Sequence, residues 1–101
     1  MSVLSFVILD ATEVTVEAAA LDGVAKVTCC AATTRDGSDV AVEALEGADV
    51  IGVWHTVWID DAILPKFPPS VRLLVRFGVG YDNVDLKACA ARGIRVCNCP
   101  N

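Results

Sequence analysis

Five short apolar runs alternate with segments that carry turn and helix signals, and this alternation constrains the fold more than any other feature. Val, Ile and Leu dominate the runs, with too little polar alternation for strands that face water on one side. Such runs are typical of strands buried on both faces of a sheet. They span residues 3–9, 24–31, 49–54, 71–77 and 94–98.

Helices are expected between these runs. Asp10 and Glu13 have the spacing of a capping box, which predicts a helix directly after the first run. The last helix is expected to begin at Asp82 or Asn83, whose side chains suit a helix N-cap, and to end at Gly93. The four expected helices end near residues 21, 45, 67 and 93.

This order of elements predicts an α/β fold with a parallel sheet and right-handed crossovers. With five strands, the expected arrangement is the flavodoxin-like doubly wound sheet of order 2-1-3-4-5. A length of 101 residues suits one domain, residues 1–101, without room for a second. In such sheets, binding sites form beyond the carboxyl ends of the strands.

Charge and composition exclude several classes of partner. The chain has 8 basic and 13 acidic residues, a net charge of −5, so it lacks a basic surface for nucleic acid or an anionic membrane. The first apolar run has no basic flank and reaches Asp10 too early for a signal peptide or a membrane span. We therefore expect an acidic cytoplasmic domain.

The chain contains five cysteines and a single histidine, His55. An odd cysteine number with a vicinal pair, Cys29 and Cys30, does not resemble a secreted disulfide framework. A zinc site would require a second cysteine pair at ligand spacing or a second histidine. We therefore expect reduced thiols and no metal site.

The segment "RFGVGYDNVD", residues 76–85, contains a Gly-x-Gly pair directly after the fourth run. A dinucleotide fingerprint would need a third glycine at the position of Asn83 and an acidic residue after the following strand. Neither is present, and the chain has no Gly-Lys-Ser/Thr sequence. The loop is therefore not expected to bind a nucleotide phosphate, and no cofactor-binding residue is assigned.

Gly78 and Gly80 still permit positive φ angles and close approach of a ligand to the backbone. Free N–H groups near a helix start suit a small anion such as a carboxylate, and Arg76 stands two residues before the loop. The alternative is an ordinary turn from strand to helix. Arg76 could equally form an ion pair with Asp82, because an unpaired charge at the end of a buried strand is costly.

From about residue 49 to residue 100, the sequence resembles the D-isomer-specific 2-hydroxyacid dehydrogenases. The resemblance rests on "LLVRFGVGYDNVDLKACAARGIRVCNCP" and on "WHT" at residues 54–56. The motifs are most similar to the branch of the C-terminal-binding-protein corepressors and phosphoglycerate-dehydrogenase-like proteins. The earlier half agrees with the family only in the order of strands and helices.

The resemblance implies hydride transfer between NAD(H) and a small 2-oxo or 2-hydroxy acid. In the family, the catalytic Arg, Glu and His and the NAD-binding fingerprint belong to a nucleotide domain that is absent from this sequence. The chain therefore resembles a truncated substrate-binding domain, inactive and without NAD on its own. The residues implied for substrate binding are His55, Arg76, Gly78, Val79 and Gly80, where the Val79 and Gly80 amides hold the carboxylate.

Alternatives remain open at this stage. His55 could line the substrate cleft or serve packing alone, and no nearby carboxylate supports it as a general base. The domain could act as a corepressor-like module that docks short peptides, which would need an exposed apolar cleft near the first two strands. It could also be a flavodoxin-like domain without a ligand. Exposure of Trp54, Cys99 and Pro100 would promote self-association, for example as a homodimer.

Overall fold

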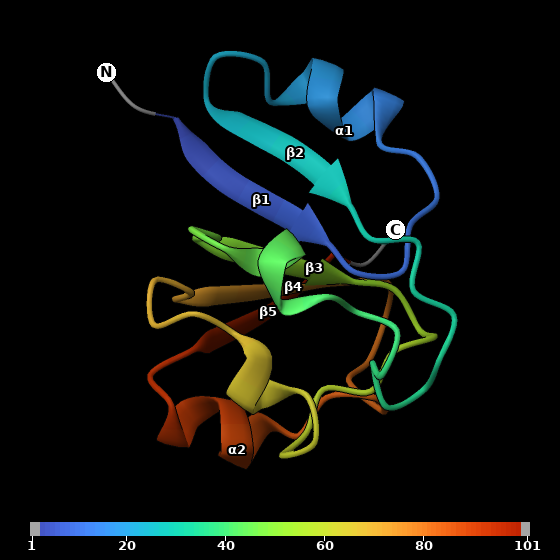
Figure 1. Cartoon of the computed structure of the whole chain (residues 1–101), viewed down its shortest axis with the longest axis vertical. Coiled ribbons are helices and arrows are strands. Elements are labelled where there is room, and N and C mark those ends of the chain that lie inside the picture. The colour runs from blue at the N-terminus through green and yellow to red at the C-terminus, as the bar shows by residue number, and fades with distance from the viewer. Residues whose placement is uncertain (1–2, 100–101) are drawn as a thin grey trace.

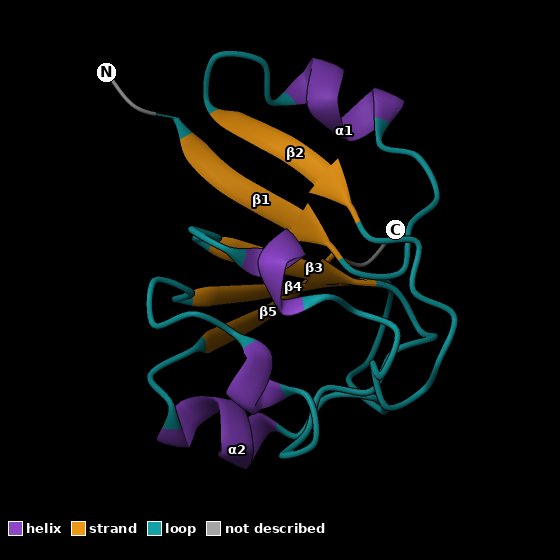
Figure 2. Ribbon diagram, in the orientation of Figure 1, coloured by secondary structure: helices purple, strands orange, loops and turns teal. Residues whose placement is uncertain are grey.

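The structure, a computed structural model, describes residues 3–99, with Cys99 by its backbone alone. Five parallel strands form one sheet in the order β2-β1-β3-β4-β5, which confirms the predicted α/β topology (Figure 1). The strands are β1 (Leu4–Ile8), β2 (Ala25–Cys29), β3 (Val50–Val53), β4 (Leu73–Phe77) and β5 (Arg95–Cys99). Figure 2 shows the α-helices α1 (Thr15–Ala20) and α2 (Leu86–Ala91) and the 3₁₀ helices η1 (Val42–Leu45) and η2 (Leu64–Lys66).

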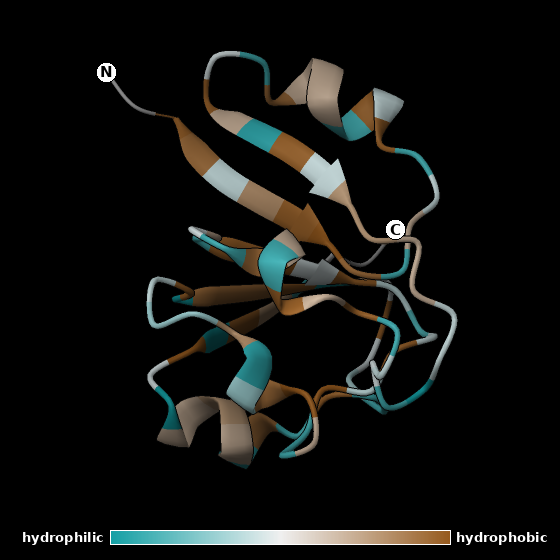
Figure 3. Cartoon of the chain, viewed as in Figure 1, coloured by the Kyte–Doolittle hydropathy of each residue, from teal (hydrophilic) through white to brown (hydrophobic). Residues whose placement is uncertain are grey.

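The sheet divides the core into two clusters, because successive strand residues point to opposite faces. Val7 pairs with Ile51 and Ile51 with Leu74 across β1, β3 and β4, and all three side chains are buried on the larger face. The brown colour along the strands in Figure 3 follows this apolar core. The prediction of strands buried on both faces is therefore confirmed for β1 and β3, whereas β4 is fully buried on the larger face only.

The smaller face of the sheet is covered mainly by α1, which lies against β2 (Figure 1). Phe6 and Ile8 are buried there, whereas Val75 and Phe77 on β4 stay half-buried. The helix has only six residues, so it cannot extend across all five strands. The β4 end of this face consequently keeps part of its apolar surface accessible.

The predicted capping box is wrong. Helix α1 begins at Thr15 after Val14, and no side chain caps it. The Asp10 carboxylate instead accepts hydrogen bonds from the segment that follows β3. The helix predicted up to residue 67 is also shorter than expected, because Pro65 lies within the brief turn of η2 and lacks the N–H that a longer helix requires.

The N-cap of α2 is Asp85, not Asp82 or Asn83. Its Oδ1 accepts a hydrogen bond from the Ala88 N–H at 3.0 Å. Helix α2 therefore begins beyond the glycine loop and does not direct its first N–H groups at it, contrary to the sequence-based prediction. None of the helices within residues 3–99 is long and apolar enough to cross a membrane.

Candidate functional site

Strands β3 and β4 are neighbours in the sheet, so the segments that follow their carboxyl ends meet at one edge. After β3 comes the histidine loop, residues 54–57, which carries His55. After β4 comes the glycine corner, residues 78–80. These two segments contain four of the five residues predicted to bind substrate, and Arg76 is the fifth, on β4 itself.

The glycine corner has the backbone conformation that its sequence predicted. Gly78 has a φ of 129° and Gly80 a φ of 93°, values that side-chain-bearing residues rarely adopt. Val79 between them is 73% exposed. Within residues 3–99, no hydrogen bond engages the N–H of Val79 or of Gly80. The corner therefore presents two adjacent donors that an anion could use.

Arg76 turns back toward the corner. Its Nε donates to Asn83 Oδ1 at 2.8 Å, and its Nη1 donates to the carbonyl of Phe77. Its partners within residues 3–99 are thus an amide and a carbonyl, and not Asp82, the alternative that the sequence left open. A methyl group on Gly78 would collide with Nη1, so glycine is required at this position for the arginine to lie as it does.

Asn83 is the residue that sequence reasoning missed. It was considered only as a helix cap or as a failed third glycine, yet its side chain is 4% exposed and is the only buried polar one that the structure describes. Its Nδ2 donates to the carbonyls of Trp54 at 3.1 Å and Val57 at 2.9 Å. Asn83 therefore joins both ends of the histidine loop to Arg76. The sequence offered only the residue type as a signal.

Asp10 holds the histidine loop from the other side. Its carboxylate accepts hydrogen bonds from the N–H groups of Trp54 at 2.8 Å, Thr56 at 2.9 Å and Val57 at 3.3 Å. The loop is thus bound through its amides to the end of β1 and through its carbonyls to Asn83. His55 itself is exposed, so it is available to line a cleft.

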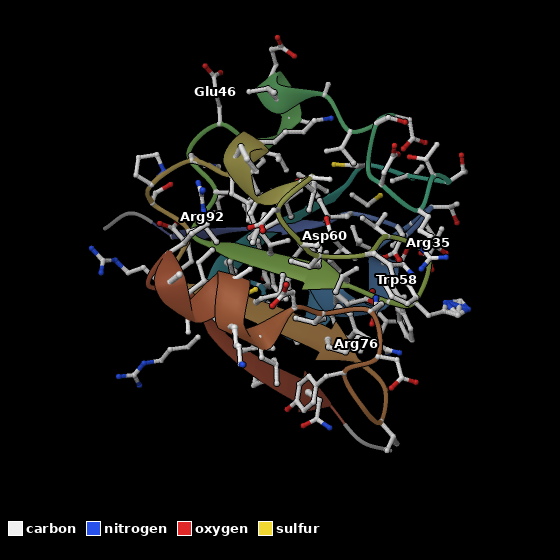
Figure 4. The ribbon with its side chains drawn as sticks, turned by 90° about the horizontal axis from the view of Figure 1, so that it is seen from below. Arg35, Glu46, Trp58, Asp60, Arg76 and Arg92 are labelled. Carbon is white, nitrogen blue, oxygen red and sulfur yellow. The ribbon has the colours of Figure 1, made fainter. Side chains whose placement is uncertain are left out.

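Both tryptophans near the site pack on neighbouring side chains. Trp54 stacks on Phe77 with ring centroids 4.9 Å apart, although it remains 41% exposed. Trp58 lies under the guanidinium of Arg35 at 3.8 Å, a cation–π contact visible in Figure 4. These contacts link the segments that follow β2, β3 and β4.

The loop after β2 is organised by one carboxylate. Asp39 accepts hydrogen bonds from the Thr34 hydroxyl at 2.6 Å and from the N–H of Thr33 at 2.8 Å. The Thr34 hydroxyl, followed by the Thr33 N–H, lowers the pKa of the Asp39 carboxyl to about 2. Asp39 therefore keeps its negative charge and its loop contacts far into the acid range.

Two cavities lie at the opposite end of the sheet. One, of about 270 Å³, is lined by Phe67, Val71 and Arg92, and Figure 4 shows Arg92 far from Arg76. The other, of about 570 Å³, lies between Leu86 on α2 and the β5 edge. Neither borders β1 or β2, where the corepressor-like alternative would need an exposed apolar cleft. In the described part of the chain, no group of His, Cys, Asp or Glu side chains is arranged to hold a metal ion.

The glycine corner does not fit a dinucleotide. The position of the third fingerprint glycine is Asn83, whose amide is already used by two loop carbonyls. The next helix, α2, has only six residues and starts at Leu86, so it cannot receive a pyrophosphate at the corner. The N–H groups of Val79 and Gly80 make no hydrogen bond within residues 3–99, an arrangement that is compatible with a smaller anion.

Comparison with known proteins identifies the family. Residues 6–101 match the family model described as D-isomer specific 2-hydroxyacid dehydrogenase, catalytic domain. The chain belongs to this family. The match begins at Phe6, so it also covers the first half of this chain. The sequence motifs had indicated the family only from about residue 49.

Solved members of the family share the fold. The NAD⁺-bound 3-phosphoglycerate dehydrogenase of Entamoeba histolytica is 27% identical, with a TM-score of 0.73 over 96% of this chain and 33% of its own. The D-lactate dehydrogenase of Aquifex aeolicus, complexed with NAD and lactic acid, is 26% identical, with a TM-score of 0.70 over 94% of this chain and 28% of its own.

A protein of Schizosaccharomyces pombe named as a 2-hydroxyacid dehydrogenase is 46% identical over 41 residues, which are 41% of this chain and 12% of that protein. The chain thus spans a third or less of the length of these dehydrogenases. The chain corresponds to a part of their catalytic domain. The shared fold does not by itself establish the activity of a whole dehydrogenase.

Proposed function

We propose that this chain is the substrate-binding portion of an NAD-dependent D-2-hydroxyacid dehydrogenase. The observation that carries the proposal is that, within residues 3–99, the N–H groups of Val79 and Gly80 make no hydrogen bond on an exposed turn of a family member. These donors bind the carboxylate of a small 2-oxo or 2-hydroxy acid, for which backbone N–H groups are well suited. The acid thereby lies at the carboxyl end of β4.

Arg76 and His55 complete the acid-binding surface. Arg76 adds positive charge beside the corner, where a partly desolvated site strengthens its attraction for a carboxylate. His55 lies exposed on the loop that Asn83 and Asp10 hold, and in this proposal it contributes to the same acid-binding surface. Neither residue is assigned proton transfer, so this portion of the enzyme positions the acid.

Hydride transfer between NAD(H) and C2 of the acid requires groups that this chain does not supply. The corner does not fit a dinucleotide, and no residue here is assigned as the acid-base. The isolated chain is therefore expected to give no turnover. Following NADH absorbance with pyruvate, glyoxylate and hydroxypyruvate checks this, and protein-dependent oxidation would contradict it.

The binding proposal is tested by NMR titration of the ¹⁵N-labelled chain with oxamate, a stable analogue of a 2-oxo acid. The largest amide shifts are expected at Val79 and Gly80, with smaller ones at His55 and Arg76. Oxamide, which has the same size but no carboxylate, is the matched control and should leave these signals unchanged. Affinity should be weak, because only one side of the cleft is present.

The same spectra contain the opposing outcome. Oxamate shifts confined to Gly93, Ile94 and their neighbours would relocate the site to the cavities beside α2. Equal shifts with oxamide would show that the carboxylate is not the recognised group. Either result would remove the proposed function while leaving the family and the fold as they are.

A further inference from the structure

The side chain of Asn83 makes three hydrogen bonds, two to the histidine loop and one to Arg76. Its two N–H groups donate to the carbonyls of Trp54 and Val57, and its Oδ1 accepts from Nε of Arg76. These distances are 3.1, 2.9 and 2.8 Å, all within the normal range. Since the side chain is buried, each of these bonds is costly to break.

This pattern specifies asparagine. Aspartate could still accept from Arg76, but it has no N–H to give and would place a negative charge against two carbonyl oxygens. Alanine would remove the hydrogen bonds to all three partners, which are the Trp54 carbonyl, the Val57 carbonyl and Nε of Arg76. The two halves of the amide can therefore be separated experimentally, since one half serves the histidine loop and the other serves Arg76.

The contact with Arg76 is not needed to satisfy the loop. The carbonyls of Trp54 and Val57 already have their donors in Nδ2, and the amides of the loop have Asp10. The third bond instead fixes the guanidinium, with Nε on Asn83 and Nη1 on the Phe77 carbonyl. Within residues 3–99, no hydrogen bond engages Nη2 of Arg76, so its N–H groups can meet an acid.

We infer that Asn83 is a positioning residue, which sets the Arg76 guanidinium and the His55 loop against the glycine corner without itself contacting the bound acid. The inference rests on the proposed function for its effect on binding. It also refines the role of Arg76, whose orientation toward the carboxylate is fixed by Asn83 and by the Phe77 carbonyl. The corner amides then provide the other contacts.

The first test uses the unmodified chain. The Nε–H signal of Arg76, assigned by its loss in Arg76→Lys, should exchange with water at least about tenfold more slowly than that of exposed Arg92. Equal exchange rates for the two arginines would overturn the inference. This measurement involves no ligand, so it holds whether or not oxamate binds.

The second test compares substitutions by oxamate titration. Asn83→Ala should abolish the slow Arg76 signal and weaken binding at least about tenfold, because a small misplacement of binding groups is enough to do so. Asn83→Asp should keep the Arg76 signal, shift the His55 amide, and weaken binding by a smaller factor. Ser70→Ala is the control, because it also removes a side-chain hydrogen bond, to the Ala48 carbonyl at 2.6 Å, but in the segment before β4 and away from the site.

The outcomes separate the two claims. If the unmodified chain does not bind oxamate, the proposed function fails, and the Arg76 exchange rate alone decides the role of Asn83. If oxamate binds equally well to the unmodified chain and to Asn83→Asp with an unmoved His55 amide, the inference is wrong. Should Asn83→Ala fail to fold, the Asp variant and the exchange measurement still decide the matter.

Discussion

The guanidinium of Arg76 lies over Gly78, two residues further along the chain, at the position that a β-carbon would occupy. Arg76 reaches this position by donating to the carbonyl of Phe77 and to Asn83. A glycine and an arginine therefore depend on each other at the end of β4. The pairing explains why the corner needs glycine for its space as well as for its φ.

Gly78→Ala should consequently do more damage than a glycine substitution nearby. The added methyl group displaces Nη1 from the Phe77 carbonyl, so the free energy of unfolding should fall by about 0.5–1.5 kcal/mol more than in Gly80→Ala. Gly80 has a positive φ too, but a β-carbon added there would meet nothing within 4 Å, so it controls for backbone strain. Urea denaturation of both variants measures the difference, and equal losses would contradict the Arg76 contact.

Asp10→Asn should loosen the histidine loop. The substitution removes the charge and one of two acceptor oxygens from a group that receives three N–H bonds. The free energy of unfolding should fall by about 2–4 kcal/mol, since each hydrogen bond to a charged group contributes about 1.5–3 kcal/mol. Asp61→Asn, on an exposed residue, is the control. Urea denaturation measures both, and an unchanged midpoint for Asp10→Asn would refute the loop assignment.

Acid should weaken the fold partly through Asp39. Hydrogen bonds from Thr34 and then Thr33 lower its folded-state pKa from 3.8 to about 2. A depressed pKa contributes stability above pH 3.8 that is lost as the pH falls toward 2. Asp39→Asn should therefore flatten the pH dependence of the unfolding free energy in this window. An unaltered slope in the variant would show that Asp39 is not responsible.

Cys89 should resist alkylation in the folded chain. Burial, followed by the nearby charge of Asp85, raises the pKa of its thiol to about 11, so almost no thiolate is present at pH 8. Cys97 is exposed and should react with iodoacetamide first. Peptide mass spectrometry distinguishes the two sites, and urea should abolish the difference. Modification of both at the same rate without urea would contradict the burial of Cys89.

The sequence alone determined the fold class, because alternating strands and helices are local patterns, and the usual doubly wound arrangement supplied the strand order. Each apolar run is long enough for one strand, and each intervening segment is long enough for one crossover. The observed order β2-β1-β3-β4-β5 agrees with that reasoning. The glycine corner was likewise predictable, since Gly78 and Gly80 mark positive φ angles locally.

Only the tertiary structure decided how polar side chains are used. The Asp10 carboxylate accepts from amides 44 to 47 residues away, and the Asn83 side chain donates to carbonyls 26 and 29 residues away. Locally, each residue looked like a helix cap, because Asp and Asn satisfy nearby N–H groups in most sequences. A side-chain hydrogen bond depends on which backbone groups lie unpaired around it once the sheet has formed, and no local pattern contains that information.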